Sequence, residues 1–210
     1  SKVRNAYDLI AEQWHATQRA PGYIEHVLRY VDRVLEGLPA GAKVLDLGCG
    51  TGEPVAKYVT ERGLRVTGVD ESEQMLMFAR QTVPKAELIH ADMVTVALVD
   101  TFDAAVAWDS MFHVERKHHA AIYRKLAGAL RAGGRLLVSV GGSAPAQDDS
   151  VEGFTSEMYG QTFYYSGFAP AVAHKLIEAS GFEIELWEVD DPTSRGHIAV
   201  IARKLASHLP

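Results

Sequence analysis

The sequence predicts an α/β fold, in which an open, doubly wound and mainly parallel sheet carries helices on both faces. Three observations lead to this prediction. From residue 43 onward, apolar segments of strand length alternate with helix-like segments. The first apolar segment runs directly into the glycine-rich turn Gly48-Cys49-Gly50-Thr51-Gly52. Acidic residues stand at the ends of the next two apolar segments. A repeated strand–helix order is typical of parallel sheets covered on both sides.

Residues 1–40 are predicted to form a helical cap ahead of this sheet. Apolar residues recur there at near-helical spacing in two groups, Val3, Tyr7, Ile10 and Trp14, then Ile24, Val27, Val31 and Leu35. Pro21-Gly22 separates the two groups, so we expect two helices.

The alternating part of the chain gives five strands and three helices. We predict strands at 44–47, 65–69, 87–90, 102–108 and 135–140, and helices at 53–62, 72–81 and 115–131. Ser72 is a plausible N-cap of the second of these helices. Gly133-Gly134 is expected to end the third. A helix at 170–180 and two consecutive strands, 182–189 and 197–203, complete the chain, and these two strands should pair antiparallel at a sheet edge.

Length and composition describe an ordinary globular chain. Its 210 residues fit one domain, residues 1–210, with 47% hydrophobic and 23% charged residues. The net charge of −6 and the lack of a long basic run argue against a nucleic-acid partner.

Cellular context is predicted from cysteine usage and apolar runs. The single cysteine, Cys49, permits no intramolecular disulfide. Residues 1–11 are too polar for a signal peptide, and the apolar runs are too short to span a membrane. We therefore expect a cytoplasmic protein with no membrane partner, and nothing requires an assembly larger than a monomer.

The glycine turn is the strongest candidate for a ligand site. Gly48, Gly50 and Gly52 let the backbone approach a ligand closely, and the following helix offers free N–H groups. In a dinucleotide site the third glycine falls three residues after the second. Here it falls two residues after, and Glu53 follows. A carboxylate there is unfavourable beside a pyrophosphate and tolerable beside a sulfonium or an amine.

Two further acids follow the next strands. Asp70 comes 24 residues after Asp46 and can accept hydrogen bonds from both hydroxyls of a ribose. Asp92 can bind an adenine amine, and the neighbouring Met93 can cover the ring. Open parallel sheets bind ligands at the carboxyl ends of their strands, where all these residues should lie.

This constellation resembles the class I S-adenosylmethionine-dependent methyltransferases, in their small-molecule branch. The likeness rests on residues 7–14, the turn at 46–52, Val-Thr-Gly-Val-Asp at 66–70, Ala-Asp-Met at 91–93, Phe-Asp-Ala-Ala-Val-Ala-Trp at 102–108, Gly-Gly-Arg-Leu-Leu-Val at 133–138 and Ser-Gly-Phe-Glu at 180–183. The resemblance implies S-adenosylmethionine as cofactor. It also implies a Rossmann-like sheet of seven strands whose last strand is antiparallel.

The resemblance also implies roles by position. Asp46 and Gly52 belong to the cofactor turn, and Gly48 and Gly50 would lie against the methionyl part of the cofactor. The remaining implied contacts are Asp70 on the ribose, Asp92 and Met93 on the adenine, the Trp108 backbone near the cofactor amine, and Tyr7 closing the site.

Residues 108–114 follow the fourth strand and should lie beside the transferred methyl group. They lack the Asn/Asp-Pro-Pro-aromatic pattern of enzymes that methylate planar amino groups. His113 is a candidate general base, or it packs against or caps the next helix. Asp109 is a candidate for binding the cofactor amine or the substrate, or for orienting the loop. With Glu115 these residues form no convincing metal site.

Residues 141–168 interrupt the strand–helix pattern with glycines, acids and aromatic residues, and long irregular segments of this kind are often functional. We expect a substrate lid in which Tyr159, Tyr164 and Tyr165 form an apolar wall with polar tips. The alternative is a cover for the sheet edge. His197, at the start of the last strand, is expected to be structural.

The expected function is methyl transfer to a small molecule that the sequence does not identify. One alternative is a regulatory protein that binds S-adenosylmethionine without catalysis, which an obstructed acceptor pocket would favour. Another is an NAD-dependent oxidoreductase, but this sequence lacks the glycine spacing that a dinucleotide site requires.

Overall fold

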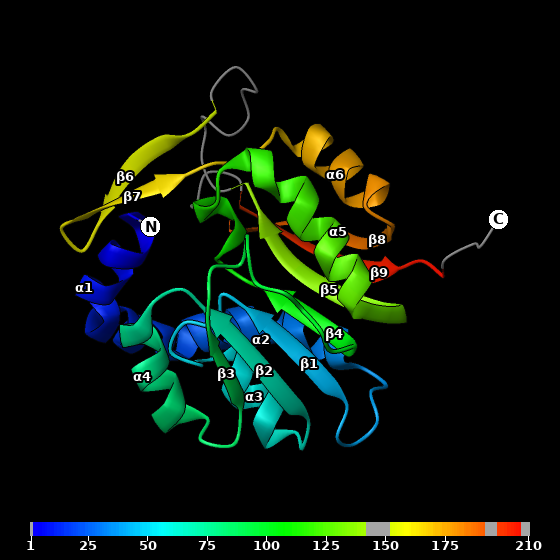
Figure 1. The fold of residues 1–210 in the computed structure, drawn as a ribbon, viewed down its shortest axis with the longest axis horizontal. Helices are drawn as coiled ribbons and strands as arrows, with labels where there is room; N and C mark the ends of the chain where they lie inside the picture. Colours follow the sequence, from blue (N-terminus) through cyan, green and yellow to red (C-terminus); the bar gives the residue numbers. More distant parts are fainter. Residues whose placement is uncertain (1, 142–151, 192–196, 207–210) are drawn as a thin grey trace.

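The computed structural model describes residues 2–141, 152–191 and 197–206. Its main feature is a seven-stranded sheet in the order β3-β2-β1-β4-β5-β9-β8 (Figure 1). β9 pairs antiparallel with both of its neighbours, and the pairs from β3 to β5 are parallel. This confirms the predicted doubly wound, Rossmann-like sheet with an antiparallel last strand.

The elements of the sheet and its helices follow the predicted order. The sheet strands are β1 Lys43–Leu47, β2 Arg65–Asp70, β3 Glu87–His90, β4 Phe102–Ala107, β5 Leu130–Val140, β8 Phe182–Asp191 and β9 His197–Lys204. The helices are α1 Lys2–Gln18, α2 Pro21–Leu35, α3 Val55–Glu61, α4 Glu73–Thr82, α5 His119–Ala129 and α6 Pro170–Ala179, with short 3-10 turns η1 Met111–His113 and η2 Arg116–His118. Ser72 caps α4 by accepting the Met75 N–H.

Side-chain alternation along the strands builds a core on each face of the sheet. In β1, Val44 packs with α2 and α3, whereas Leu45 packs with α5 and α6. In β4, Val106 and Ala107 divide between the same two clusters. Successive residues of a strand point to opposite faces, so apolar strands of this kind need helices on both sides. The two helix layers can be followed in Figure 1.

The helix predicted at 115–131 is shorter in the structure, and its expected glycine stop is wrong. α5 ends at Ala129, and β5 already begins at Leu130, which pairs with Phe102 of β4. Gly133-Gly134 therefore lies within a strand. A Cβ at Gly134 would lie 2.9 Å from the Asp103 carbonyl oxygen, so glycine permits this close pairing. Tertiary pairing with β4 overrides the local helix signal here.

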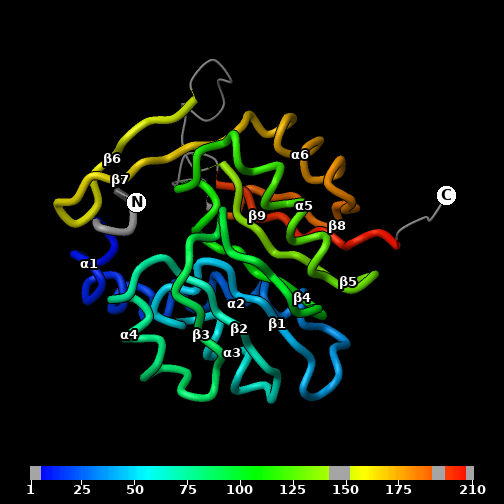
Figure 2. Tube along the Cα trace, in the orientation of Figure 1, coloured from blue at the N-terminus to red at the C-terminus, as the bar shows by residue number. Residues whose placement is uncertain are grey.

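Part of the segment 141–168, which was predicted to be irregular, forms regular structure. β6 Phe154–Met158 and β7 Gln161–Tyr165 form an antiparallel hairpin, and residues 142–151 lie outside the described residues. Its turn, Tyr159-Gly160, has φ values of +50° and +72°, which suit a two-residue hairpin turn. Phe163 is fully buried against Ile10 of α1. Figure 2 shows the hairpin beside α1, so α1 and the hairpin form one layer, whereas α2 packs against the main sheet.

Among the described residues, no helix combines the length and the apolar character needed to cross a bilayer.

Candidate functional site

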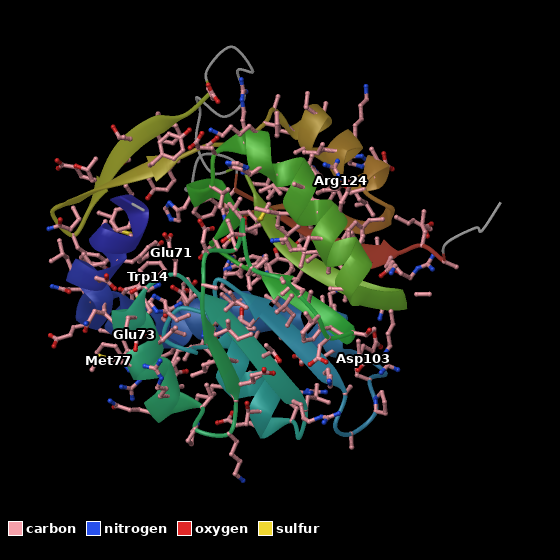
Figure 3. All side chains as sticks on the ribbon, in the orientation of Figure 1. Trp14, Glu71, Glu73, Met77, Asp103 and Arg124 are labelled. Carbon is pink, nitrogen blue, oxygen red and sulfur yellow. The ribbon has the colours of Figure 1, made fainter. Side chains whose placement is uncertain are left out.

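Two adjoining cavities lie at the carboxyl ends of the parallel strands, beneath α1 and the β6–β7 hairpin. The larger has a volume of about 970 Å³ and the smaller about 270 Å³. Both are lined by Tyr7, Trp14, Trp108, Asp109 and His113. We call the larger one the cofactor cavity and the smaller one the acceptor cavity. Figure 3 labels Trp14 on α1 and Glu71 after β2, whose side chains line the cofactor cavity.

The glycine turn after β1 forms one wall of the cofactor cavity. Gly48 and Gly50 line it, with φ values of +86° and +53°. A Cβ at Gly48 would lie only 2.4 Å from the Ser110 Cβ, so this position requires glycine. The Ser110 hydroxyl donates to the Leu47 carbonyl oxygen at 3.0 Å. The turn after β1 and the loop after β4 are therefore in direct contact.

Asp70 is held by two backbone N–H groups. Its Oδ2 accepts from Gly50 at 2.8 Å and its Oδ1 from Ser72 at 2.9 Å. Burial raises the pKa of Asp70 to about 6, although these donors favour the ionised form. Each carboxylate oxygen retains a lone pair for a ligand hydroxyl. Asp70 lines the cofactor cavity in this fixed orientation.

The loop after β3 is fixed in a similar way. Asp92 Oδ1 accepts the Val94 N–H at 2.7 Å, which makes a local turn. Lys125 Nζ on α5 donates to the carbonyl oxygens of Met93 and Val94 at 2.8 and 2.9 Å. Asp92 and Met93 both line the cofactor cavity.

Three residues predicted for the site line neither cavity. Asp46 is 3% exposed, and burial together with Asp70 raises its pKa to about 7. Gly52 faces α4, where a Cβ would lie 3.2 Å from Val83. These two residues support the turn from behind. Tyr159 lies at the hairpin turn, 48% exposed, with its hydroxyl 2.5 Å from that of Thr17.

α1 closes the cofactor cavity from above. The Thr51 hydroxyl in the glycine turn donates at 2.7 Å to Gln18 Oε1 at the end of α1. Asp8 accepts the Ser72 hydroxyl at 2.5 Å. Gln18 also lines the cavity, and it had no motif in the sequence to reveal it. The cap is therefore tied to the ends of both β1 and β2.

His113 lies in the lining shared by the two cavities. Its Nδ1 is 2.9 Å from the Tyr164 carbonyl oxygen, so this nitrogen must carry the proton. Nε2 is then the acceptor for the Tyr7 hydroxyl at 2.8 Å. Burial lowers the pKa of His113 to about 4. The ring is therefore neutral at pH 7, and it faces the cavities and does not cap a helix.

Asp109 also lies in the shared lining, in a backbone conformation that few non-glycine residues adopt. Its φ is +49°, and its N–H donates to the Ser139 hydroxyl at 2.7 Å. Oδ2 accepts the Tyr23 hydroxyl at 2.8 Å, and Oδ1 lies 3.0 Å from His197 Nε2. Unusual backbone conformations of this kind concentrate at functional sites.

His197, which was expected to be structural, lines the acceptor cavity and pairs with two acids there. Its Nδ1 lies 2.5 Å from Asp190 Oδ1. Asp190 Oδ2 lies 2.9 Å from His26 Nε2. Burial opposes the charged form of His197, but the carboxylates of Asp109 and Asp190 outweigh it and raise the pKa to about 10. An imidazolium is thus held between two carboxylates.

The tyrosines of the hairpin divide between the cavities. Tyr164 lines the cofactor cavity, and Tyr165 lines the acceptor cavity, where its ring stacks on Phe112 with centroids 5.9 Å apart. Within the described residues, no group of three or more histidine, cysteine or acidic side chains is placed to hold a metal ion.

The fold and the cavity together define an α/β protein with a nucleotide-type ligand site at the carboxyl edge of its sheet. Comparison with known families agrees, because residues 44–134 match the family model described as a methyltransferase domain. This segment contains the glycine turn, Asp70, Asp92 and the β4 loop.

Curated relatives include two methyltransferases from bacteria. The 27-O-demethylrifamycin SV methyltransferase of Amycolatopsis mediterranei is 35% identical over 123 residues, which cover 54% of this chain and 44% of that protein. Methyltransferase GfsG of Streptomyces halstedii is 32% identical over 168 residues, which cover 73% of this chain and 58% of that protein. The chain thus spans about half the length of these relatives.

A solved structure with the same fold is the DhpI complex with S-adenosylhomocysteine, at a TM-score of 0.74 and 20% identity over 97% of this chain and 96% of that chain. These comparisons confirm the resemblance drawn from the sequence. The chain belongs to the class I S-adenosylmethionine-dependent methyltransferases.

Proposed function

We propose that this protein transfers a methyl group from S-adenosylmethionine to a small molecule bound in the acceptor cavity. The observation that carries the proposal is the junction of the two cavities. They share five lining residues, so ligands in both would meet beside Asp109 and His113. Proximity and alignment of two reactants supply much of the catalysis that a displacement reaction needs.

The lining of the cofactor cavity suits S-adenosylmethionine. Gly48 and Gly50 offer open backbone for the methionyl part, and Asp70 offers carboxylate lone pairs to the ribose hydroxyls. Asp92 and Met93 supply a carboxylate and an apolar side chain for the adenine. We further propose that the Trp108 backbone binds near the cofactor amine and that Tyr7 closes the site.

The bound cofactor would supply an electrophilic methyl carbon, to which the acceptor's lone pair bonds as the carbon–sulfur bond breaks and its electron pair stays on sulfur. The protein's own groups would manage the proton that the acceptor loses. Two oxygens are available at the junction, the Asp109 carboxylate and the phenolic oxygen of Tyr7. The Tyr7 hydroxyl donates its proton to His113 Nε2. Tyr7 could therefore accept the proton of the methyl acceptor while the phenolic proton of Tyr7 passes to His113.

The alternatives have less support. A regulatory protein without catalysis predicts an obstructed acceptor pocket, whereas this chain has a second cavity that adjoins the first. An NAD-dependent oxidoreductase predicts a dinucleotide fingerprint, whereas the matching family is that of methyltransferases.

We also propose that the protein acts in the cytoplasm as a monomer. Its single thiol, Cys49, is free and buried, and it needs no oxidising compartment. Light scattering after size exclusion would test the monomer, which corresponds to 22.9 kDa.

The test of the cofactor is calorimetric titration with S-adenosylmethionine, S-adenosylhomocysteine and NAD in parallel. The proposal expects micromolar binding of both adenosyl compounds and no binding of NAD. Binding of NAD alone would overturn the interpretation of the glycine turn and the proposed function with it.

A further inference from the structure

The acceptor cavity has aromatic walls. Its rings come from α1, α2, the loop after β4 and the hairpin, and they belong to Tyr7, Trp14, Tyr23, Trp108, Phe112 and Tyr165. Neighbouring rings meet mostly edge to face, for example Tyr7 with Trp14 and Trp14 with Tyr23, at centroid distances of 6.1 and 6.4 Å. The faces of such rings attract cations as well as apolar groups.

The charges in this cavity favour a positive ligand. Two carboxylates line it, Asp109 and Asp190, and the His197 ring lies between them, with His26 against the far oxygen of Asp190. No lysine or arginine of the described residues lines either cavity. Because the His197 imidazolium is already held between two carboxylates, a phosphate or carboxylate ligand would lose its hydration there without gaining an unpaired cationic partner, and this loss is costly.

Asp109 is the carboxylate that a ligand can reach. Its side chain is 20% exposed, whereas that of Asp190 is 2% exposed and is enclosed by its histidine partners.

We propose that the methyl acceptor is an amine, which enters the acceptor cavity as an ammonium and binds to the Asp109 carboxylate against the aromatic rings. This proposal rests on the proposed function and names its substrate class. The ammonium R–NH3+ then gives one proton to Asp109, which leaves R–NH2 and the protonated carboxyl. The nitrogen lone pair becomes free for methylation at the junction of the cavities.

The test uses three probes of similar shape with the protein saturated in S-adenosylhomocysteine: benzylamine, benzyl alcohol and benzoate. Affinities are measured by calorimetry at pH 7.5, where a primary amine is protonated. We expect benzylamine to bind about 10-fold more tightly than benzyl alcohol, as one charge-assisted hydrogen bond implies, and benzoate to bind more weakly than either. Equal affinities, or tighter binding of benzoate, would overturn the proposal.

Asp109→Asn assigns the effect to one residue. In this variant benzylamine and benzyl alcohol should bind with about equal affinity, and the affinity for benzyl alcohol should stay within about 3-fold of the parent's value. Asp32→Asn is the matched control, because Asp32 is an exposed acid that pairs with Arg62 outside the cavities, and the preference should persist there. A preference that survives in folded Asp109→Asn contradicts the assignment.

Two further variants keep the test decisive. If Asp109→Asn fails to fold, Trp14→Leu should still lower the affinity for benzylamine more than that for benzyl alcohol, and an equal loss would count against the proposal. Arg195→Ala removes the cation in segment 192–196, outside the described residues. Benzoate binding that depends on Arg195 would reject an amine acceptor. Failure to bind S-adenosylhomocysteine would instead reject the proposed function itself.

Discussion

Asp70→Ala gives the sharpest test of how the protein holds its cofactor. If Asp70 accepts the ribose hydroxyls, the variant loses at least one charge-assisted hydrogen bond, which contributes about 1.5–3 kcal/mol. That loss corresponds to a fall in S-adenosylhomocysteine affinity of about 10- to 100-fold. The Gly50 and Ser72 N–H groups also lose their acceptor, so the turn becomes less ordered. This second effect should add to the loss of affinity.

The pH dependence separates the role of the carboxylate from a general weakening of the fold. Because the pKa of Asp70 is about 6, its oxygens are ionised at pH 8 and become protonated as the pH falls below 6. The affinity of the parent protein should therefore decline between pH 7 and pH 5. The Asp70→Ala variant should lose this part of the pH dependence.

The assay is calorimetric titration of both proteins at pH 8 and pH 5.5, with unfolding by circular dichroism as the check on folding. Asp32→Ala is the control for loss of an acid, since Asp32 lies in an exposed ion pair with Arg62. An unchanged affinity in a folded Asp70→Ala protein would refute the ribose assignment.

Three further predictions concern stability. Asp46→Asn should raise the free energy of unfolding at pH 8 by about 1 kcal/mol or more, as measured in urea titrations. The reason is that the folded pKa of Asp46, about 7, lies above the ordinary 3.8, so the stability of the parent falls as the pH rises through 7. No gain over the parent at pH 8 would contradict this. His197→Gln should cost about 3 kcal/mol at pH 6 in free energy of unfolding, since the buried carboxylate of Asp190 and the partly buried one of Asp109 lose their partner. The difference in free energy of unfolding between the parent and His197→Gln should shrink between pH 6.5 and 10, as the raised folded pKa of about 10 requires. A difference that stays constant over this range would count against the imidazolium. Gly48→Ala should be more destabilising than Gly63→Ala by about 1 kcal/mol or more in thermal unfolding, because both glycines have positive φ but only the first would clash, with Ser110; equal losses would argue against the close approach.

The sequence was sufficient for the sheet and for most of the cofactor cavity, because both depend on local signals. A buried strand, a glycine turn and an acid at the next strand end are each readable within a few residues, and the parallel order brings them together. Gly48, Asp70 and Asp92 all line the cavity as expected. The exceptions are Asp46, which is buried in β1 just before the turn, and Gly52, which lies in the turn but faces α4.

The acceptor cavity could not be predicted in the same way, because it is built by contacts distant in sequence. Asp190 and His197 meet across the β8–β9 pair, and His26 reaches them from α2. None of the three stands in a motif. Tyr159 shows the same limit, since its place at the exposed hairpin turn depends on how the hairpin packs on α1.

The two cavities also differ in which part of the chain supplies them. The cofactor cavity takes most of its lining from residues 44–134, the segment that matches the methyltransferase family. The acceptor cavity takes only part of its lining from that segment. The other lining residues lie outside it: Tyr7, Trp14, Tyr23, His26, Gly141, Met158, Tyr165, Asp190 and His197. Likeness to relatives over the shared segment therefore carries information about the cofactor and little about the acceptor. The choice of acceptor must be argued from the cap, the hairpin and the last two strands, together with the loop after β4, which supplies Asp109 and the rings of Trp108 and Phe112.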